Sequence, residues 1–366
     1  MSLALSDLLP YPIVQAPMAG GVSVPRLAAA VSEAGGLGFL AAGYKTADGM
    51  YQEIKQLRGL TARPFGVNVF MPRHTDHADP AAVEVYAEQL AGESAWYGTE
   101  LGDPHCGGHD DGYDAKLAVL LEDPVPAVSF HFGCPAPEVV EALAAKGTVT
   151  LVTATTADEA RAVELSGAHA VIVQGIEAGG HQGTHRDDAE RDGAGVGLLT
   201  LLAQVREAVA LPVVAAGGLV RGGQIAAVLA AGASAAQLGT AFLATPESGA
   251  HELHKRALTD PVFARTELTR AFTGRPARAL LNRFAREHGP YAPAAYPELH
   301  HLTSGLRRAA AAAGDAQGMA LWAGQGHRLA RELPAGELVE VLMRELTAAA
   351  TALSGRADDT VGGGAR

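Results

Sequence analysis

A glycine-rich loop that carries a histidine follows an apolar segment near the middle of the chain. Residues 170–183 read AVIVQGIEAGGHQG, so the apolar run ends at Gln174 and the loop then presents Glu177 and His181. Glycines let the backbone approach a ligand closely, and a loop histidine can exchange protons near neutral pH. The stretch therefore predicts acid–base chemistry on a ligand, although an ordinary turn with a surface histidine has the same pattern.

Two further glycine elements lie one strand and one helix apart in the second half of the chain. They read VVAAGGL at 213–219 and AQLGTAF at 236–242. In many barrels the loops after the seventh and eighth strands bind a phosphate through backbone N–H groups. Gly217 and Gly218 would allow that approach, and Thr240 adds a hydroxyl group. We therefore expect a phosphate-bearing cofactor such as FMN, with tight turns alone as the alternative. The chain contains no GxxxxGK[ST] motif, so we do not expect a nucleoside triphosphate as the ligand.

Eight short apolar segments must position these loops. Most are separated by segments with apolar residues at helical spacing, and several of those end at a glycine. Such alternation predicts a parallel sheet buried on both faces, and eight units fit a TIM-type (β/α)8 barrel of the α/β class. The PMAGG turn after the first strand does not match the GxGxxG of an open, doubly wound sheet. The predicted strands are 13–18, 37–42, 65–70, 127–132, 149–154, 170–174, 212–216 and 235–240.

Polar residues gather where the predicted strands end, which is where such a barrel builds its site. A single buried polar residue often only satisfies backbone groups. The shared position of several nevertheless predicts one site at one end of the barrel. These residues are Asn68, His131, Gln174, Gln237 and Thr240.

The alternation of strands and helices ends after the eighth strand. We predict that residues 1–245 and 318–353 form the barrel, and that residues 246–317 form a smaller, mostly helical domain inserted over its mouth. Residues 354–366 are glycine-rich and polar, which predicts a disordered tail.

A second insertion, residues 92–118, is acidic and glycine-rich. Its candidate ligands have no compact zinc-site spacing, so we predict a loose acidic loop and no metal site. These candidates are His105, Cys106, His109, Asp110 and Asp111.

The composition limits the classes of function. The 366 residues are 48% hydrophobic and 19% charged, with a net charge of −12 and no basic run. This argues against nucleic acid and anionic membranes as partners. There is no signal-peptide pattern, no run of transmembrane length and only two cysteines, so we expect a cytoplasmic protein. The Ala-rich segments 309–313 and 337–353 could pack within one chain or between two chains. A homodimer is therefore one possible oligomeric state.

Six motifs, in this order, resemble the nitronate monooxygenase family, formerly called 2-nitropropane dioxygenase. The resemblance covers most of the chain and extends to YPELHHLT at 296–303 and LWAGQG at 321–326. It implies an FMN-dependent barrel enzyme. The six motifs are QAPMAGG (15–21), FGVNVF (65–70), SFHFG (129–133), GIEAGGHQG (175–183), AAGGL (215–219) and AQLGTAF (236–242).

The resemblance also implies roles for particular residues. His181 would be the catalytic histidine, His131 a second active-site histidine, and Tyr296 would line the substrate pocket. Trp322 and Gln325 would close over the flavin. The remaining FMN contacts would be Ala16, Pro17, Met18, Asn68, Gln174, Gly179, Gly180, Gly217, Gly218, Gln237, Leu238, Gly239 and Thr240.

The implied reaction is the oxidation of alkyl nitronates, and of nitroalkanes if they are accepted, by O2 to carbonyl compounds and nitrite. It would proceed by one-electron transfer to the flavin. His181 would either remove the α-proton of a nitroalkane or, as an imidazolium, pair with the nitronate. His131 would donate a hydrogen bond or be a core histidine. An FMN-dependent NAD(P)H:quinone or enoyl-thioester reductase on the same scaffold is one alternative, and a non-redox phosphate-binding barrel is another.

Overall fold

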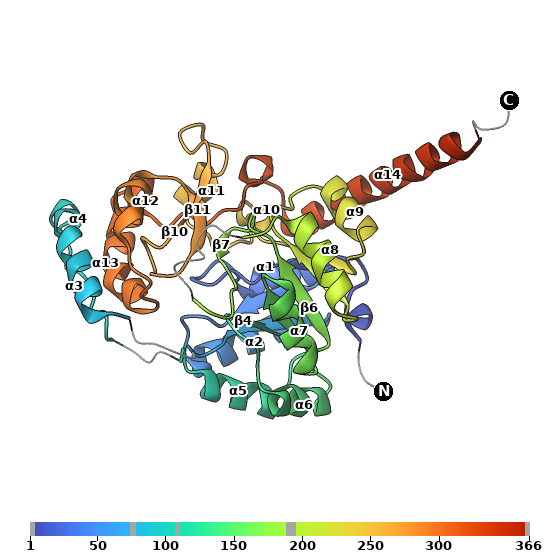
Figure 1. Ribbon diagram of the computed structural model, residues 1–366, viewed down its shortest axis with the longest axis horizontal. Coiled ribbons are helices and arrows are strands. Elements are labelled where there is room, and N and C mark those ends of the chain that lie inside the picture. The colour runs from blue at the N-terminus through green and yellow to red at the C-terminus, as the bar shows by residue number, and fades with distance from the viewer. Residues whose placement is uncertain (1–3, 74–77, 107–109, 188–194, 363–366) are drawn as a thin grey trace.

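Eight parallel strands form a barrel at the centre of the molecule (Figure 1). The computed structural model describes residues 4–73, 78–106, 110–187 and 195–362. The strands pair in the order β1-β9-β8-β6-β5-β4-β3-β2, and Leu37 before β2 pairs with Val14 of β1, so the two ends of the sheet meet. The predicted (β/α)8 barrel is therefore confirmed. The strands are β1 (Ile13–Gln15), β2 (Gly38–Ala41), β3 (Phe65–Phe70), β4 (Ala127–His131), β5 (Val149–Ala154), β6 (Ala170–Gln174), β8 (Val213–Ala216) and β9 (Ala235–Leu238).

Helices cover the outside of the barrel, and local sequence explains where several begin. A proline occupies the first turn of α1 and of α6, where its missing N–H costs nothing. The hydroxyls of Thr46 and Thr156 accept the N–H groups of Gly49 and Glu159 at the starts of α2 and α7. The helices are α1 (Pro25–Glu33), α2 (Ala47–Leu60), α5 (Tyr113–Glu122), α6 (Pro137–Ala145), α7 (Ala157–Leu165), α8 (Leu198–Ala208), α9 (Gly222–Ala230), α10 (Thr240–Leu243) and α14 (Ala335–Gly362).

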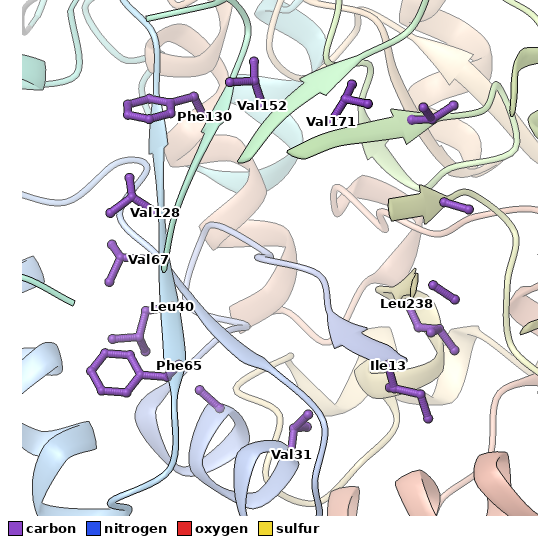
Figure 2. Packing of buried hydrophobic residues seen from close by; sticks show 14 of the residues in the cluster. Ile13, Val31, Leu40, Phe65, Val67, Val128, Phe130, Val152, Val171 and Leu238 are labelled. Atoms are coloured by element: carbon purple, nitrogen blue, oxygen red, sulfur yellow. The ribbon is translucent and has the colours of Figure 1, made fainter. Parts of the chain in front are cut away.

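Alternate residues of each strand belong to two different hydrophobic layers. Leu40, Val152 and Val171 belong to the large layer that includes helix residues (Figure 2). Their neighbours Phe39 and Leu151 belong to a second layer made almost entirely of strand residues. All five side chains are essentially fully buried, as expected of parallel strands covered on both faces.

A second unit lies beside the barrel mouth and differs from the predicted helical insert. It contains an antiparallel pair, β10 and β11, and β11 pairs in turn with β7 of the histidine loop. Two of the four residues of β10 are threonine, which favours strands, and pairing with β11 completes the strand. The prediction of a mostly helical insert was therefore incomplete, and the domain division stays a prediction. The elements here are α3 (Pro80–Gln89), α4 (Ala91–Tyr97), β7 (Gly180–His181), α11 (Glu252–Ala257), β10 (Thr266–Thr269), β11 (Ala277–Leu280), α12 (Arg283–His288) and α13 (Glu298–Ala312).

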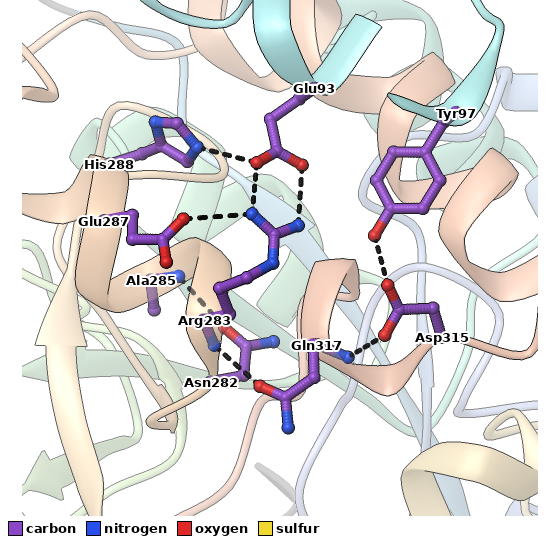
Figure 3. A network of polar contacts seen from close by, with 9 residues as sticks. All are labelled: Glu93, Tyr97, Asn282, Arg283, Ala285, Glu287, His288, Asp315 and Gln317. Carbon is purple, nitrogen blue, oxygen red and sulfur yellow. Dashed lines mark hydrogen bonds and ion pairs between the residues drawn. The ribbon is translucent and has the colours of Figure 1, made fainter. Parts of the chain in front are cut away.

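A polar network joins α4 to α12 within this unit (Figure 3). The carboxylate of Glu93 accepts two hydrogen bonds from the guanidinium of Arg283 and lies 3.1 Å from Nε2 of His288. Tyr97 donates to Asp315 at 2.6 Å nearby. Helices α3 and α4 come from the first third of the chain, so the second unit is not built from residues 246–317 alone.

The C-terminal prediction was partly wrong. Helix α14 continues to Gly362 and extends away from the rest of the protein in Figure 1, whereas we predicted disorder from residue 354. Arg356 and Ala357 favour a helix, and Gly355 within it costs only about 1 kcal/mol. Residues 363–366 lie outside the described residues. None of the described helices is long and apolar enough to cross a membrane.

Candidate active site

A large cavity opens at the carboxyl ends of the barrel strands. It holds about 1210 Å³ of space not filled by protein atoms, solvent at its mouth included. The predicted site residues that line it are Ala16, Pro17, Met18, Asn68, His131, Gln174, Gly179, Gly180, His181, Gly217, Gly218, Gln237, Gly239, Thr240 and Trp322.

Three predicted residues do not line this cavity. Leu238 is 1% exposed and packs in the core instead. Gln325 contributes its backbone, whose N–H donates to the carbonyl oxygen of Glu177 at 3.0 Å. Tyr296 reaches the cavity indirectly: its hydroxyl donates to the hydroxyl of Tyr44, a lining residue, at 3.3 Å. Their functional roles stay predictions.

The side chain of His181 is held by the second unit. The residue lies on β7 and pairs with Ala277 of β11. Its Nε2 lies 2.9 Å from Oγ1 of Thr273, and that hydroxyl donates to the carbonyl oxygen of Arg275 at 3.4 Å. A hydroxyl that donates elsewhere must accept from Nε2–H, so this arrangement favours a lone pair on Nδ1.

Aromatic rings surround the His181 imidazole. The ring centroids of Phe132, Tyr296 and Trp322 lie 5.6, 5.7 and 5.5 Å from that of His181. These rings belong to the loop after β4, to the segment before α13 and to the segment before α14. They surround a polar group with apolar surface, which raises the cost of charging it.

The two histidines that line the cavity have lowered pKa values. Burial lowers the pKa of His181 well below its usual value, and the charge of Arg275 lowers it further, with smaller effects of His131, His300 and Arg307. Burial also lowers the pKa of His131 to about 3. A neutral imidazole can accept a proton but cannot pair as a cation.

The polar residues at the strand ends mostly fix the loop and one another. Gln174 donates from Nε2 to the carbonyl oxygen of His181 at 3.1 Å and accepts from the N–H of Gly183 at 2.7 Å. Asn68 donates to Oγ of Ser129 at 3.0 Å. Nδ1 of His131 lies 3.2 Å from Oγ1 of Thr153, on the neighbouring strand.

Glu177 supports the loop and has no catalytic geometry. Its two carboxylate oxygens lie 2.9 and 3.0 Å from the N–H of Leu198, the first residue of α8. A carboxylate at a helix start satisfies a free N–H and complements the helix dipole. The side chain thus ties the loop after β6 to the next helix.

Another part of the cavity wall is lined by backbone and has an unsatisfied acceptor. Gly217 and Gly218 have φ of +133° and +67°, which other residues rarely adopt, and they bring backbone to the cavity wall. Oε1 of Gln237 is buried and has no hydrogen-bond partner among the described residues. A buried acceptor without a partner is costly, so these residues fit a bound ligand that presents an N–H group.

Our motif analysis missed Tyr44, which lies in the loop after β2. Its N–H donates to Oδ1 of Asp111 at 2.9 Å, and Oδ2 of Asp111 pairs with Nζ of Lys116 at 2.6 Å. Tyr44 follows the end of a predicted strand, and that position could have indicated a site residue. Other missed lining residues are Phe70, Ser129, Thr153 and His254.

The acidic insertion thus contributes an anchor for Tyr44 rather than a loose loop. His109 lies outside the described residues. Within the described part of the chain, the metal-like group is Glu93, Glu287 and His288, and Arg283 already occupies the carboxylate of Glu93.

Fold and cavity together define a TIM-barrel enzyme that works at the carboxyl ends of its strands. The chain belongs to the nitronate monooxygenase family, whose model matches residues 2–345. The nitronate monooxygenase of Pseudomonas aeruginosa is 46% identical over 342 residues, which are 92% of this chain and 96% of that protein. That of Paraburkholderia phytofirmans is 45% identical over 92% of both chains. The family resemblance and the oxidoreductase class are therefore confirmed.

Solved structures agree with this family. Nitroalkane oxidase from Streptomyces ansochromogenes superposes with a TM-score of 0.93 and 79% identity, over 95% of this chain and 99% of that one. FabK from Thermotoga maritima superposes with a TM-score of 0.73 and 29% identity, over 96% and 98%.

Proposed function

We propose that this enzyme oxidises small alkyl nitronates with O2 to carbonyl compounds and nitrite, using FMN. The observation that carries this proposal is a half-buried histidine of lowered pKa inside the cavity of a barrel of this family. Nitroalkanes and their nitronates differ by one α-proton, so a neutral base is the group that such a substrate needs. The cytoplasmic location and the oligomeric state stay predictions.

The residues of the cavity fit FMN. Gly217, Gly218, Gly239 and Thr240 would hold its phosphate with backbone N–H groups and a hydroxyl, and the unsatisfied Oε1 of Gln237 would accept from the N–H of its ring. Ala16 to Met18 and Asn68 would contact the ring. When bound, FMN supplies the acceptor for substrate electrons and passes them to O2.

The chain's own part of the reaction is to prepare and hold the substrate. Thr273 orients His181 so that Nδ1 removes the α-proton of a neutral nitroalkane, leaving the nitronate in place. Phe132, Tyr296 and Trp322 keep water from the imidazole. A preformed nitronate needs no proton removal, so His181 then only positions it.

Replacing His181 separates these two tasks. His181→Asn should retain FMN, seen in its absorption band, and lose about 100-fold or more in nitrite release from nitroethane, as removal of a general base typically does. Ethylnitronate should lose much less. His105→Asn, on an exposed loop, is the matched control. Equal rates of wild type and variant with both substrates would show that His181 is not the base.

A reductase on the same scaffold is the second candidate, and it is favoured by the similarity to FabK. Anaerobic mixing with NADH and with NADPH distinguishes the two. Rapid bleaching of the flavin would support the reductase, whereas unbleached flavin together with nitrite release from ethylnitronate in air supports the proposed oxidation.

A further inference from the structure

Arg275 is a buried cation next to the active site. It precedes β11 and is 5% exposed. Its Nη2 donates to the carbonyl oxygen of Thr184 and lies 3.3 Å from Oγ1 of the same residue. Its Nε is buried and has no hydrogen-bond partner among the described residues. Burial lowers the pKa of this guanidinium, yet arginine stays protonated at neutral pH.

Among the described residues, the carboxylates that influence Arg275 are engaged elsewhere. The carboxylate of Asp187 forms its ion pair with Arg270 at 2.7 Å. The carboxylate of Glu159 accepts backbone N–H groups of Thr155 and His185 at 2.6 and 2.8 Å. Within the described part of the chain, no ion pair involves Arg275. A buried charge without a close counter-ion is expensive and needs a reason.

The guanidinium of Arg275 and the imidazole of His181 lie against the same two aromatic rings. Its Cζ lies 4.0 Å from the ring centroid of Phe132 and 6.0 Å from that of Tyr296. Both rings in turn contact His181. In surroundings this dry, a charge is little screened over the width of one ring.

The cavity itself has no cationic side chain. Among the described residues that line it, none is lysine or arginine. Arg307, which is half-buried, is the other arginine that influences His181, and its effect is smaller. Its guanidinium donates to the carbonyl oxygen of His300 at 2.9 Å and to Oγ1 of Thr303 at 3.2 Å. A positive electrostatic potential at an anionic substrate must therefore come mainly from Arg275, which lies outside the cavity lining.

We propose that Arg275 is a specificity-determining residue whose positive charge makes the cavity favour an anionic nitronate over a neutral nitroalkane. This rests on the proposed function. The guanidinium does not touch the substrate; it acts through its field across Phe132. The same charge disfavours protonation of His181, so one residue both attracts the anion and keeps the base neutral.

The test compares Arg275→Met, Arg275→Lys and the exposed control Arg308→Met as FMN-loaded enzymes. Three readouts are the kcat/KM for ethylnitronate and for nitroethane, the Kd of nitrate as a planar anion, and the pH profile of kcat/KM. Arg275→Met should lower kcat/KM for ethylnitronate and weaken nitrate binding by about tenfold or more, as loss of one weakly screened charge predicts. Nitroethane should change about twofold or less, and Arg308→Met should resemble wild type.

The pH profile and the lysine variant separate charge from structure. The groups facing His181 are Arg275, His131, His300, Arg307 and the hydroxyl of Tyr296. Loss of the Arg275 charge removes a cause that lowers the His181 pKa, so the acidic limb should move to higher pH. Arg275→Lys keeps the charge and should keep most of the preference for the nitronate.

Several results would overturn the proposal: equal losses with both substrates, unchanged nitrate binding, or a lysine variant as impaired as the methionine variant. If Arg275→Met does not fold, Arg275→Gln replaces it, because an amide can still donate to Thr184. A wild-type enzyme that binds nitrate but oxidises no nitronate would refute the proposed function alone.

Discussion

Asp111 should hold the active-site tyrosine in place from the acidic insertion. It accepts the N–H of Tyr44 and pairs with Lys116, whose side chain is completely buried. Tyr44 has φ of +65°, a strained conformation for this residue. Its ring lies in the cavity wall, stacked on His300 with centroids 4.0 Å apart, and it accepts from Tyr296. Asp111→Ala therefore removes both the acceptor of a strained residue and the partner of a buried ammonium.

The expected loss of stability follows from these two contacts. Removing one partner of a buried ion pair costs about 3–5 kcal/mol, and a lost hydrogen bond costs about 1 kcal/mol. The Asp111 side chain is 19% exposed, so water replaces part of the contact. We therefore expect a decrease of about 3 kcal/mol in the free energy of unfolding. The KM for ethylnitronate should rise because Tyr44 is released.

Urea unfolding and steady-state kinetics measure these effects on the same samples. Asp110→Ala, at the exposed neighbouring acid, makes the same change of charge without touching Tyr44 or Lys116. The double variant Asp111→Asn/Lys116→Met removes both charges and should lose about 1 kcal/mol or less, since uncharged pairs of similar size often replace buried ion pairs. If Asp111→Ala loses no more than Asp110→Ala and keeps its KM, the insertion does not anchor Tyr44.

Two further substitutions test the second unit and the loop. Glu93→Gln should cost about 2–3 kcal/mol at pH 7, because Glu93 is 6% exposed and bonded to Arg283. Arg283 lowers the Glu93 pKa below its usual 4.5, so urea midpoints of wild type and variant should converge as the pH falls below 4.5. Gly179→Ala would place a Cβ 2.4 Å from N of Gly324, and this overlap should weaken FMN retention about tenfold. The ratio of flavin to protein absorbance measures it, and Gly223→Ala, with open space, is the control.

The barrel was predictable because its strands are short apolar runs with clear boundaries. The predicted bounds of β3, β5 and β6 agree with the structure to the residue. The prediction for β1 was too long at its carboxyl end. There Gln15 accepts the N–H of Phe39 and donates to Ser23, so its side chain bonds both the neighbouring strand and the turn that follows. A side-chain bond of this kind has no periodicity that a sequence pattern could reveal.

The parts of the site that escaped prediction depend on distant contacts. Tyr44 and Asp111 are 67 positions apart, and neither residue alone suggests the other. Arg275 had no signal, because it precedes a strand in a segment that we expected to be helical. The glycine loop was recognised because glycine and histidine have local chemical meaning, whereas a buried arginine acquires its role only from what surrounds it.

The described non-glycine residues with positive φ all lie around this site, and together they position its aromatic rings. Tyr44, Asp111 and Phe132 have φ of +65°, +53° and +73°, where only glycine is comfortable. Each costs of the order of 1–3 kcal/mol, and such strain persists only where the surroundings demand it. Two of the three place aromatic rings around the cavity, and the third fixes one of those two. Phe132 contacts both Arg275 and His181, so its strained backbone holds the ring that these two groups share.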